Sequence, residues 1–160
     1  MASSSYRQYS RLYDPIRKAW VKETPEERVR QKLLQILVRD LHFPVNMLAV
    51  EKELSQLPHL QLFCDIPKRR IDILAFAKRG DDFWPLLMIE CKAEKLNPQF
   101  ANQLVGYNSF VQAPFLCLAN EKEVVTGSYD DEAGHFRFEP GLKSYSRLLA
   151  LAQSPSAVFN

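Results

Sequence analysis

The chain has 160 residues, of which 46% are hydrophobic and 25% are charged, with a formal net charge of +2. This size and composition are typical of one globular domain, and so small a net charge does not by itself indicate a nucleic-acid partner. Three cysteines without a C-x-x-C spacing and three scattered histidines argue against a disulfide framework and a zinc site. We therefore expect reduced thiols in a cytoplasmic protein. No membrane span, secretory signal or nucleotide-motor motif is evident.

The first 23 residues divide into a Ser-rich lead and a more apolar arm. We expect residues 1–10 to be flexible, and a disordered tail is an equal alternative for this part. We expect the arm to pack on the body through Tyr13, Ile16 and Trp20.

The segment Thr24-Pro25-Glu26-Glu27 predicts the start of a helix that runs to about Leu41. Thr24 is a suitable N-cap, and Glu27 would complete a capping box. At about 100° per residue, Glu26 points along the apolar stripe and Glu27 points away from it. Capping and dipole compensation explain Glu27, so we take Glu26 as the candidate functional acid. The predicted stripe consists of Val29, Leu33, Ile36 and Leu37.

A first strand is predicted over residues 48–54, followed by loop-like residues 55–67. The basic triplet Lys68-Arg69-Arg70 leads into the next apolar run. Two interpretations of the triplet stay open: a solvated lead-in to a strand, or phosphate contacts beside an active site.

Residues 70–76 and 86–92 are apolar runs too short for a helix and rich in branched side chains, so both predict strands. Residues 78–82 between them have turn chemistry, which predicts an antiparallel hairpin. Folding this hairpin at Asp81 places Phe76 opposite Leu86.

Two carboxylates and a lysine converge at one end of the predicted hairpin. In the same register Asp72 lies opposite Glu90, close enough for one ion to touch both. Side chains of a strand alternate between faces, so Lys92 shares the face of Glu90, whereas the Cys91 thiol points into the core. Buried charges are costly unless they are paired or bound to a metal, so this end predicts an ion site.

Asn97-Pro98 opens a second helix that runs to about Gln112. Gln103 and Tyr107 lie one turn apart on the same face of this helix. One interpretation of Gln103 is a polar residue of the core whose hydrogen bonds are satisfied. The other is that both side chains position the substrate or the lysine, because the helix returns over the strand end that carries Glu90.

The remaining residues predict strands over 115–119 and 123–126, a polar hairpin over 129–139 and a closing amphipathic helix over 144–153. No repeat or linker interrupts the chain. We therefore expect a single domain over residues 1–160.

The charged cluster suits metal-assisted phosphodiester chemistry. Asp72, Glu90 and the backbone carbonyl of Cys91 offer the oxygen ligands that Mg²⁺ prefers, with Mn²⁺ as a substitute. Glu26 would hold a second ion or a metal-bound water. Lys92 would stabilise a developing hydroxide or orient it toward the phosphodiester, and the metal would offset charge on the phosphate.

These motifs make the chain similar to a known group of nucleases. It resembles the PD-(D/E)XK nuclease superfamily, and more closely the N-terminal nuclease domain of type I restriction enzyme R subunits. The resemblance extends over roughly residues 11–127, most of the chain. It rests on residues 24–31, 49–52, 70–74, 89–93 and 102–108.

The resemblance implies a restriction-endonuclease-like α/β (α+β) fold, with a central mixed β-sheet flanked by helices. Our first hypothesis of function is a nuclease that carries out Mg²⁺-dependent hydrolysis of DNA. Asp72, Glu90 and Lys92 match the superfamily's Asp and Glu-x-Lys, and Gln103 and Tyr107 match the Q-x-x-x-Y element of RecB-like nucleases. The partners expected from it are DNA, no membrane, and a homodimer or the partner subunits of a restriction or repair complex.

Some features depart from the family pattern or leave alternatives open. Ile71 stands where the superfamily has Pro, and either Glu26 or Glu27 could match the helix acid. No helicase motor accompanies the nuclease-like part, so the substrate does not carry over, and RNA stays open beside DNA. Two alternatives to a nuclease remain: a module that binds nucleic acid or protein without cutting, and a plain ion pair at a strand end.

Overall fold

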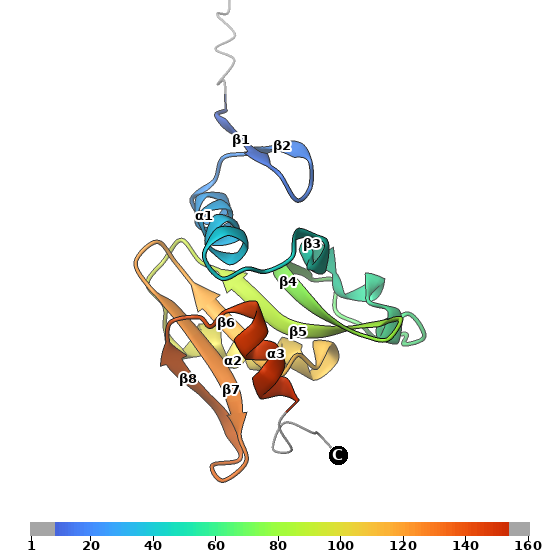
Figure 1. Ribbon diagram of the computed structural model, residues 1–160. Helices are drawn as coiled ribbons and strands as arrows, with labels where there is room; N and C mark the ends of the chain where they lie inside the picture. The colour runs from blue at the N-terminus through green and yellow to red at the C-terminus, as the bar shows by residue number, and fades with distance from the viewer. Residues whose placement is uncertain (1–8, 154–160) are drawn as a thin grey trace, which may run out of the picture.

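The structure, a computed structural model, describes residues 9–153, so the predicted flexible lead lies almost entirely outside it (Figure 1). A six-stranded mixed sheet is flanked by three helices, as predicted. The helices are α1 (Pro25–Arg39), α2 (Pro98–Val111) and α3 (Tyr145–Ala152). The strands of this sheet are β3 (Leu48–Glu53), β4 (Arg70–Arg79), β5 (Asp82–Cys91), β6 (Phe115–Ala119), β7 (Val124–Asp130) and β8 (His135–Pro140).

The strands lie in the order β3-β4-β5-β6-β7-β8. The pair β5–β6 is parallel, and the other four neighbouring pairs are antiparallel. Parallel neighbours need a long crossover connection, and α2 provides it here. The predicted polar hairpin is the β7–β8 pair, although β7 begins earlier and runs longer than expected.

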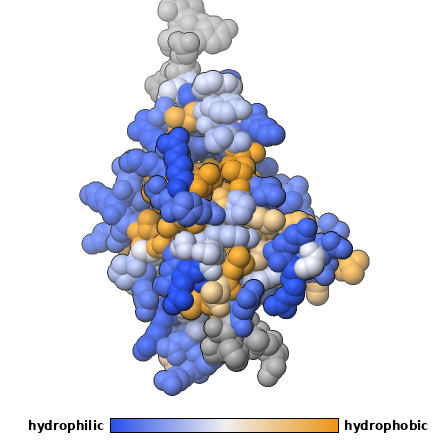
Figure 2. All heavy atoms as spheres, in the orientation of Figure 1, coloured by the Kyte–Doolittle hydropathy of each residue, from blue (hydrophilic) through white to orange (hydrophobic). Residues whose placement is uncertain are grey.

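The two faces of the central strands carry separate hydrophobic clusters. Ile73 and Ile89 face the cluster that includes α1 and α3. Leu74 and Met88 face the cluster that includes α2. Figure 1 shows α3 in front of the sheet and α2 behind it, and Figure 2 shows mostly hydrophilic residues around a more hydrophobic centre of the same face. The functional side chains must therefore emerge at an end of these strands, because both faces are covered.

The predicted β4–β5 hairpin forms, but its register changes along its length. Ile73 pairs with Ile89, as the prediction requires. Nearer the turn, a bulge places Phe76 opposite Pro85, so its predicted pairing with Leu86 is wrong. A proline cannot donate to the ladder, and bulges are where strands accommodate it. The bulge leaves the far end of the hairpin in the predicted register.

Helix α1 begins as predicted, with the Thr24 side chain accepting a hydrogen bond from the Glu27 amide at 3.0 Å. The predicted apolar stripe is wrong at Ile36, which is exposed, whereas Leu34 is buried. The buried face of the helix is thus rotated from the predicted one. Its members are Glu27, Val29, Arg30, Leu33, Leu34 and Leu37.

The predicted N-terminal arm is a two-stranded hairpin formed by β1 (Arg11–Asp14) and β2 (Ala19–Lys22). Ile16 packs against the core, as expected. Tyr13 and Trp20 are exposed and contact each other edge to face, so their predicted packing on the body is wrong. Figure 1 shows this hairpin above α1, away from the central sheet, and Arg17 between its strands binds Glu27 of α1. Across residues 9–153, no helix has both the length and the apolar character needed for a membrane span.

Candidate active site

Asp72 on β4 and Glu90 on β5 lie at the same end of the central hairpin, next to the Ile73–Ile89 pair. The Asp72 carboxylate accepts a hydrogen bond from the backbone amide of Cys91 at 2.7 Å, which ties it to the end of β5. The Cys91 side chain is buried in the core, as predicted, and burial raises the pKa of its thiol well above the usual value. This thiol is therefore not available as a ligand at the strand end.

Glu90 is surrounded by two cations. Its Oε1 atom accepts hydrogen bonds from Arg69 Nη2 at 2.5 Å and from Lys92 Nζ at 3.1 Å. Even so, burial and the nearby charge of Asp72 raise the pKa of Glu90 above its ordinary value. The two carboxylates therefore repel each other, and a positive charge placed between them would be favoured.

Arg30 on α1 joins three acids that are far apart in the sequence. Its guanidinium contacts Glu27 Oε2 at 2.5 Å, Asp72 Oδ1 at 2.6 Å and Glu51 Oε1 at 2.8 Å. Arg30 itself is buried, and a planar guanidinium can serve several carboxylates at once. Arg30 thereby fixes the orientation of Asp72 from the side of the helix.

The helix acid in this cluster is Glu27, only 6% exposed, and not Glu26, which is exposed. The predicted orientation of the two acids is thus wrong. Glu27 also accepts hydrogen bonds from Arg17 at 2.5 Å and Gln31 at 2.9 Å, instead of reaching back to close the predicted capping box. The predicted apolar stripe did not include Arg30, which is buried and binds Glu27. The functional role of either acid stays a prediction.

Glu51 is a site residue that sequence reasoning missed. Its backbone has a φ of 57°, in the left-handed region that costs about 1–3 kcal/mol for a residue with a side chain. Its carboxylate binds Arg30 and also contacts Arg70 at 3.4 Å. Through Arg30, the Glu51 carboxylate shares a cation with Asp72.

The predicted Q-x-x-x-Y pair divides between two environments. Tyr107 lies under the guanidinium of Arg69, 4.2 Å from its ring centroid, which is a cation–π contact. Phe100, on the same helix, makes a similar contact with Lys92 at 4.8 Å. Gln103 is exposed, and within residues 9–153 it makes no hydrogen bond to Asp72, Glu90 or Lys92. Helix α2 thus supports the two cations of Glu90 through aromatic rings, while the role of Gln103 stays a prediction.

The donor chemistry of this end fits a hard divalent cation. Asp72 and Glu90 bring carboxylate oxygens together, and such oxygens are preferred by Mg²⁺. Within residues 9–153, however, no group of three or more His, Cys, Asp or Glu residues is arranged to hold a metal. Arg30 and Arg69 balance the acids in the structure. The predicted ligands Glu26 and the Cys91 carbonyl remain expectations.

The two helix acids provide a matched test of the cluster. Glu27→Gln should lower the free energy of unfolding by about 1–3 kcal/mol, because Arg30 and Arg17 lose a buried charged partner. Glu26→Gln should change it by less than about 0.5 kcal/mol, since Glu26 is exposed. Urea unfolding of both variants checks this. Equal effects would show that Glu27 does not hold the cluster together.

The raised pKa of Glu90 predicts a pH-dependent stability. A carboxyl whose pKa is higher in the folded chain than in the unfolded chain favours folding only while it is protonated. This contribution is complete below the unfolded value of about 4.3 and is lost as the pH rises through the folded pKa. Glu90→Gln should therefore raise Tm relative to wild type at neutral pH, with the gap closing toward about pH 4. Glu94→Gln, an exposed acid nearby, serves as the control. A gap that is constant with pH would contradict the prediction.

A mixed sheet flanked by helices, with Asp72, Glu90 and Lys92 at one end of the central hairpin, is an α+β fold consistent with a restriction-endonuclease-like domain. A family model described as the type I restriction enzyme R protein N terminus matches residues 25–142. The chain therefore belongs to this family, and its resemblance to the R-subunit N-terminal domain is confirmed. Comparison with curated proteins and with solved structures found no match.

Proposed function

We propose that the chain is a Mg²⁺-dependent nuclease that hydrolyses DNA phosphodiester bonds. The observation that carries the proposal is that Asp72 and Glu90 lie at one end of the β4–β5 hairpin, with the Lys92 ammonium 3.1 Å from Glu90. Family membership supports a nuclease-like role for this group.

The residues have separate tasks in this proposal. Asp72 and Glu90, with the carbonyl of Cys91, would hold Mg²⁺, which when bound supplies a Lewis acid that offsets charge on the scissile phosphate. Lys92 donates a hydrogen bond to the attacking oxygen and stabilises its developing charge. Arg30 keeps Asp72 in place through its hydrogen bond at 2.6 Å. Arg69 must leave Glu90 for a metal to bind, and the exposed face of the site gives it room to turn toward a phosphate.

The wider setting of the proposal follows from the family. Members are parts of R proteins of type I restriction enzymes, so a DNA substrate and a homodimer or partner subunits are proposed for this chain. Three free cysteines, two of them buried, support a reducing cytoplasmic setting. RNA remains the competing substrate.

The proposal is tested by metal binding and cleavage together. The purified chain should bind Mn²⁺ in a calorimetric titration and cut plasmid, linear or single-stranded DNA only when Mg²⁺ or Mn²⁺ is present. An RNA of the same sequence tests the competing substrate. A chain that neither binds these metals nor cuts any of these nucleic acids is not a nuclease.

A second candidate function is a module that binds nucleic acid without cutting it. The observation in its favour is that Arg30 and Arg69 already balance the two acids, as a site without a metal would require. Binding without metal-dependent cleavage, with a steep dependence on salt, would favour this candidate.

A further inference from the structure

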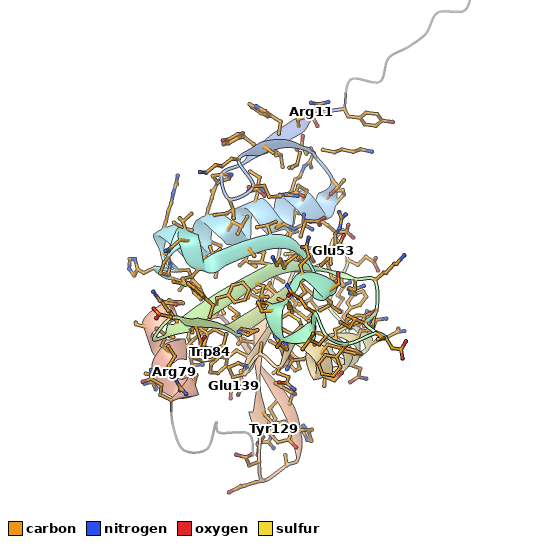
Figure 3. The ribbon with its side chains drawn as sticks, turned by 90° about the vertical axis from the view of Figure 1, so that its right-hand side faces the viewer. Arg11, Glu53, Arg79, Trp84, Tyr129 and Glu139 are labelled. Carbon is orange, nitrogen blue, oxygen red and sulfur yellow. The ribbon has the colours of Figure 1, made fainter. Side chains whose placement is uncertain are left out.

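A hollow of about 570 Å³ opens beside the candidate active site, between the end of β3 and the start of β4. Its volume lies in the range of ligand-binding clefts. Figure 3 views the molecule from the side of this segment, and the labelled Glu53 marks the end of β3 at the rim. The wall that matters here is formed by Phe63, Cys64, Lys68, Arg69 and Arg70.

The hollow is connected to the acid pair through Arg69. The Arg69 side chain lines the hollow and also hydrogen-bonds Glu90. A ligand that occupies the hollow and contacts Arg69 therefore shares this side chain with Glu90.

The charges of the hollow favour an anion. Lys68 is exposed and makes no ion pair within the described part of the chain, so its charge is free to bind a ligand. Arg70 contacts Glu51 and Glu53 at 3.4 Å, and its side chain is 62% exposed. Glu53 is the one acid in the wall, and Arg70 offsets it. Three consecutive cations thus line the hollow; Arg69 and Arg70 are paired with acids, and Lys68 carries the unpaired charge.

The apolar side chains of the same segment favour a flat ring as the ligand. Phe63 is 66% exposed although it lines the hollow, and it makes no aromatic or cation–π contact with residues 9–153. An exposed aromatic ring beside cations is the usual platform for an unpaired base with its phosphates. An internal base of a duplex cannot use this platform, because both of its faces are already stacked.

We infer that this hollow, defined by Phe63, Lys68, Arg69 and Arg70, binds a single-stranded segment of nucleic acid next to the acid pair. One base stacks on Phe63, and the neighbouring phosphates contact Lys68 and Arg70. The inference rests on the proposed nucleic-acid function and adds to it that the substrate contains an unpaired stretch. Arg69 then exchanges Glu90 for a phosphate of this strand.

Binding should be measured by fluorescence anisotropy in EDTA, so that no cleavage occurs, with a labelled single strand and a blunt duplex of the same sequence. Phe63→Ala should weaken single-strand binding about 5- to 100-fold and leave duplex binding unchanged. Phe63→Trp should bind like wild type. Leu62→Ala, which removes an exposed apolar side chain from the same segment but not from the hollow, is the matched control. Lys68→Ala should reduce the slope of log affinity against log salt by about 1.

A second readout needs no mutation. Cys64 lines the hollow and is exposed, whereas Cys91 and Cys117 are buried, and burial raises the pKa of Cys117 to about 12. A maleimide should therefore label Cys64 first, and the single strand should slow this labelling while the duplex should not.

The outcomes separate this inference from the proposed nuclease. If Phe63→Ala binds single strands as tightly as wild type, or loses single-strand and duplex binding equally, the inference is wrong even where wild type cleaves DNA. That result would leave the exposed Leu62 and Phe63 as a surface for a protein. If single-strand binding depends on Phe63 and Cys64 is protected, the inference stands, even where added Mg²⁺ produces no cleavage and the nuclease proposal fails.

Discussion

A chain with Asp72 replaced by Asn should lose Mg²⁺-dependent DNA cleavage by about 10³-fold or more while keeping its fold. The single oxygen of the Asn side chain can still accept the hydrogen bond from the Cys91 amide, so the end of β5 keeps its anchor, although the hydrogen bond from Arg30 is lost. It lacks the charge that attracts a cation, and the affinity for Mn²⁺ should fall in the same calorimetric titration. Comparing Asp72→Asn with wild type therefore tests the loss of the carboxylate charge without disrupting the end of β5.

The control for this experiment is Asp81→Asn at the turn of the same hairpin. Asp81 is exposed and lies in the turn between β4 and β5, at the opposite end of the hairpin from Asp72. Figure 3 labels Arg79 and Trp84 of the two strands near this turn. The Asp81→Asn variant should cleave DNA and bind metal like wild type. If Asp72→Asn cuts DNA as fast as Asp81→Asn, the acid pair is not the catalytic centre and the nuclease proposal loses its main support.

Arg30→Met should destabilise the protein by about 3–5 kcal/mol, because three acids then lose the buried cation that they share. For a chain of this length the loss corresponds to a fall in Tm of about 6–20 °C. Arg30→Lys should recover only part of it, since a single ammonium cannot match three carboxylates in a fixed fork. Thermal unfolding of both variants measures the difference.

Arg28 on the same helix provides the matched control. It pairs with Glu23 at 2.6 Å but its side chain is 58% exposed, so Arg28→Met should cost at most about 1 kcal/mol. Similar losses for Arg28→Met and Arg30→Met would show that Arg30 does not hold the acids together. A double-mutant cycle of Arg30→Met with Asp72→Asn should also reveal a coupling of about 0.5–3 kcal/mol between the two residues.

The sheet and the acid pair could be predicted because both depend on local patterns. Apolar runs of strand length predicted β4 and β5, and the turn residues between them predicted that the two strands form a hairpin. The alternation of side chains then placed Asp72 and Glu90 at one end. The bulge near Pro85 lies between the acids and the turn. It changes the partner of Phe76 but leaves Asp72 and Glu90 at the same end of the hairpin.

The support of the acids could not be predicted because it depends on distant partners. Arg30 lies outside the predicted stripe, and it is buried where Glu27, Glu51 and Asp72 bind its guanidinium, with Asp72 42 positions further along the chain. The buried face of α1 therefore includes Arg30 and Glu27, and Glu26 is exposed. The left-handed backbone of Glu51 is likewise not predictable, since no glycine marks it in the sequence.

The N-terminal hairpin reaches the site through a line of alternating charges. Asp14 is fully buried and binds Arg17, Arg17 binds Glu27, and Glu27 binds Arg30, which holds Asp72. The family match begins at residue 25, so it does not include Asp14 and Arg17. Choosing that boundary for a shortened gene would leave the homologous region whole and yet remove one of the two guanidinium partners of Glu27. Inactivity of such a shortened chain would then reflect the missing hairpin, and the full chain is the proper material for any assay of this site.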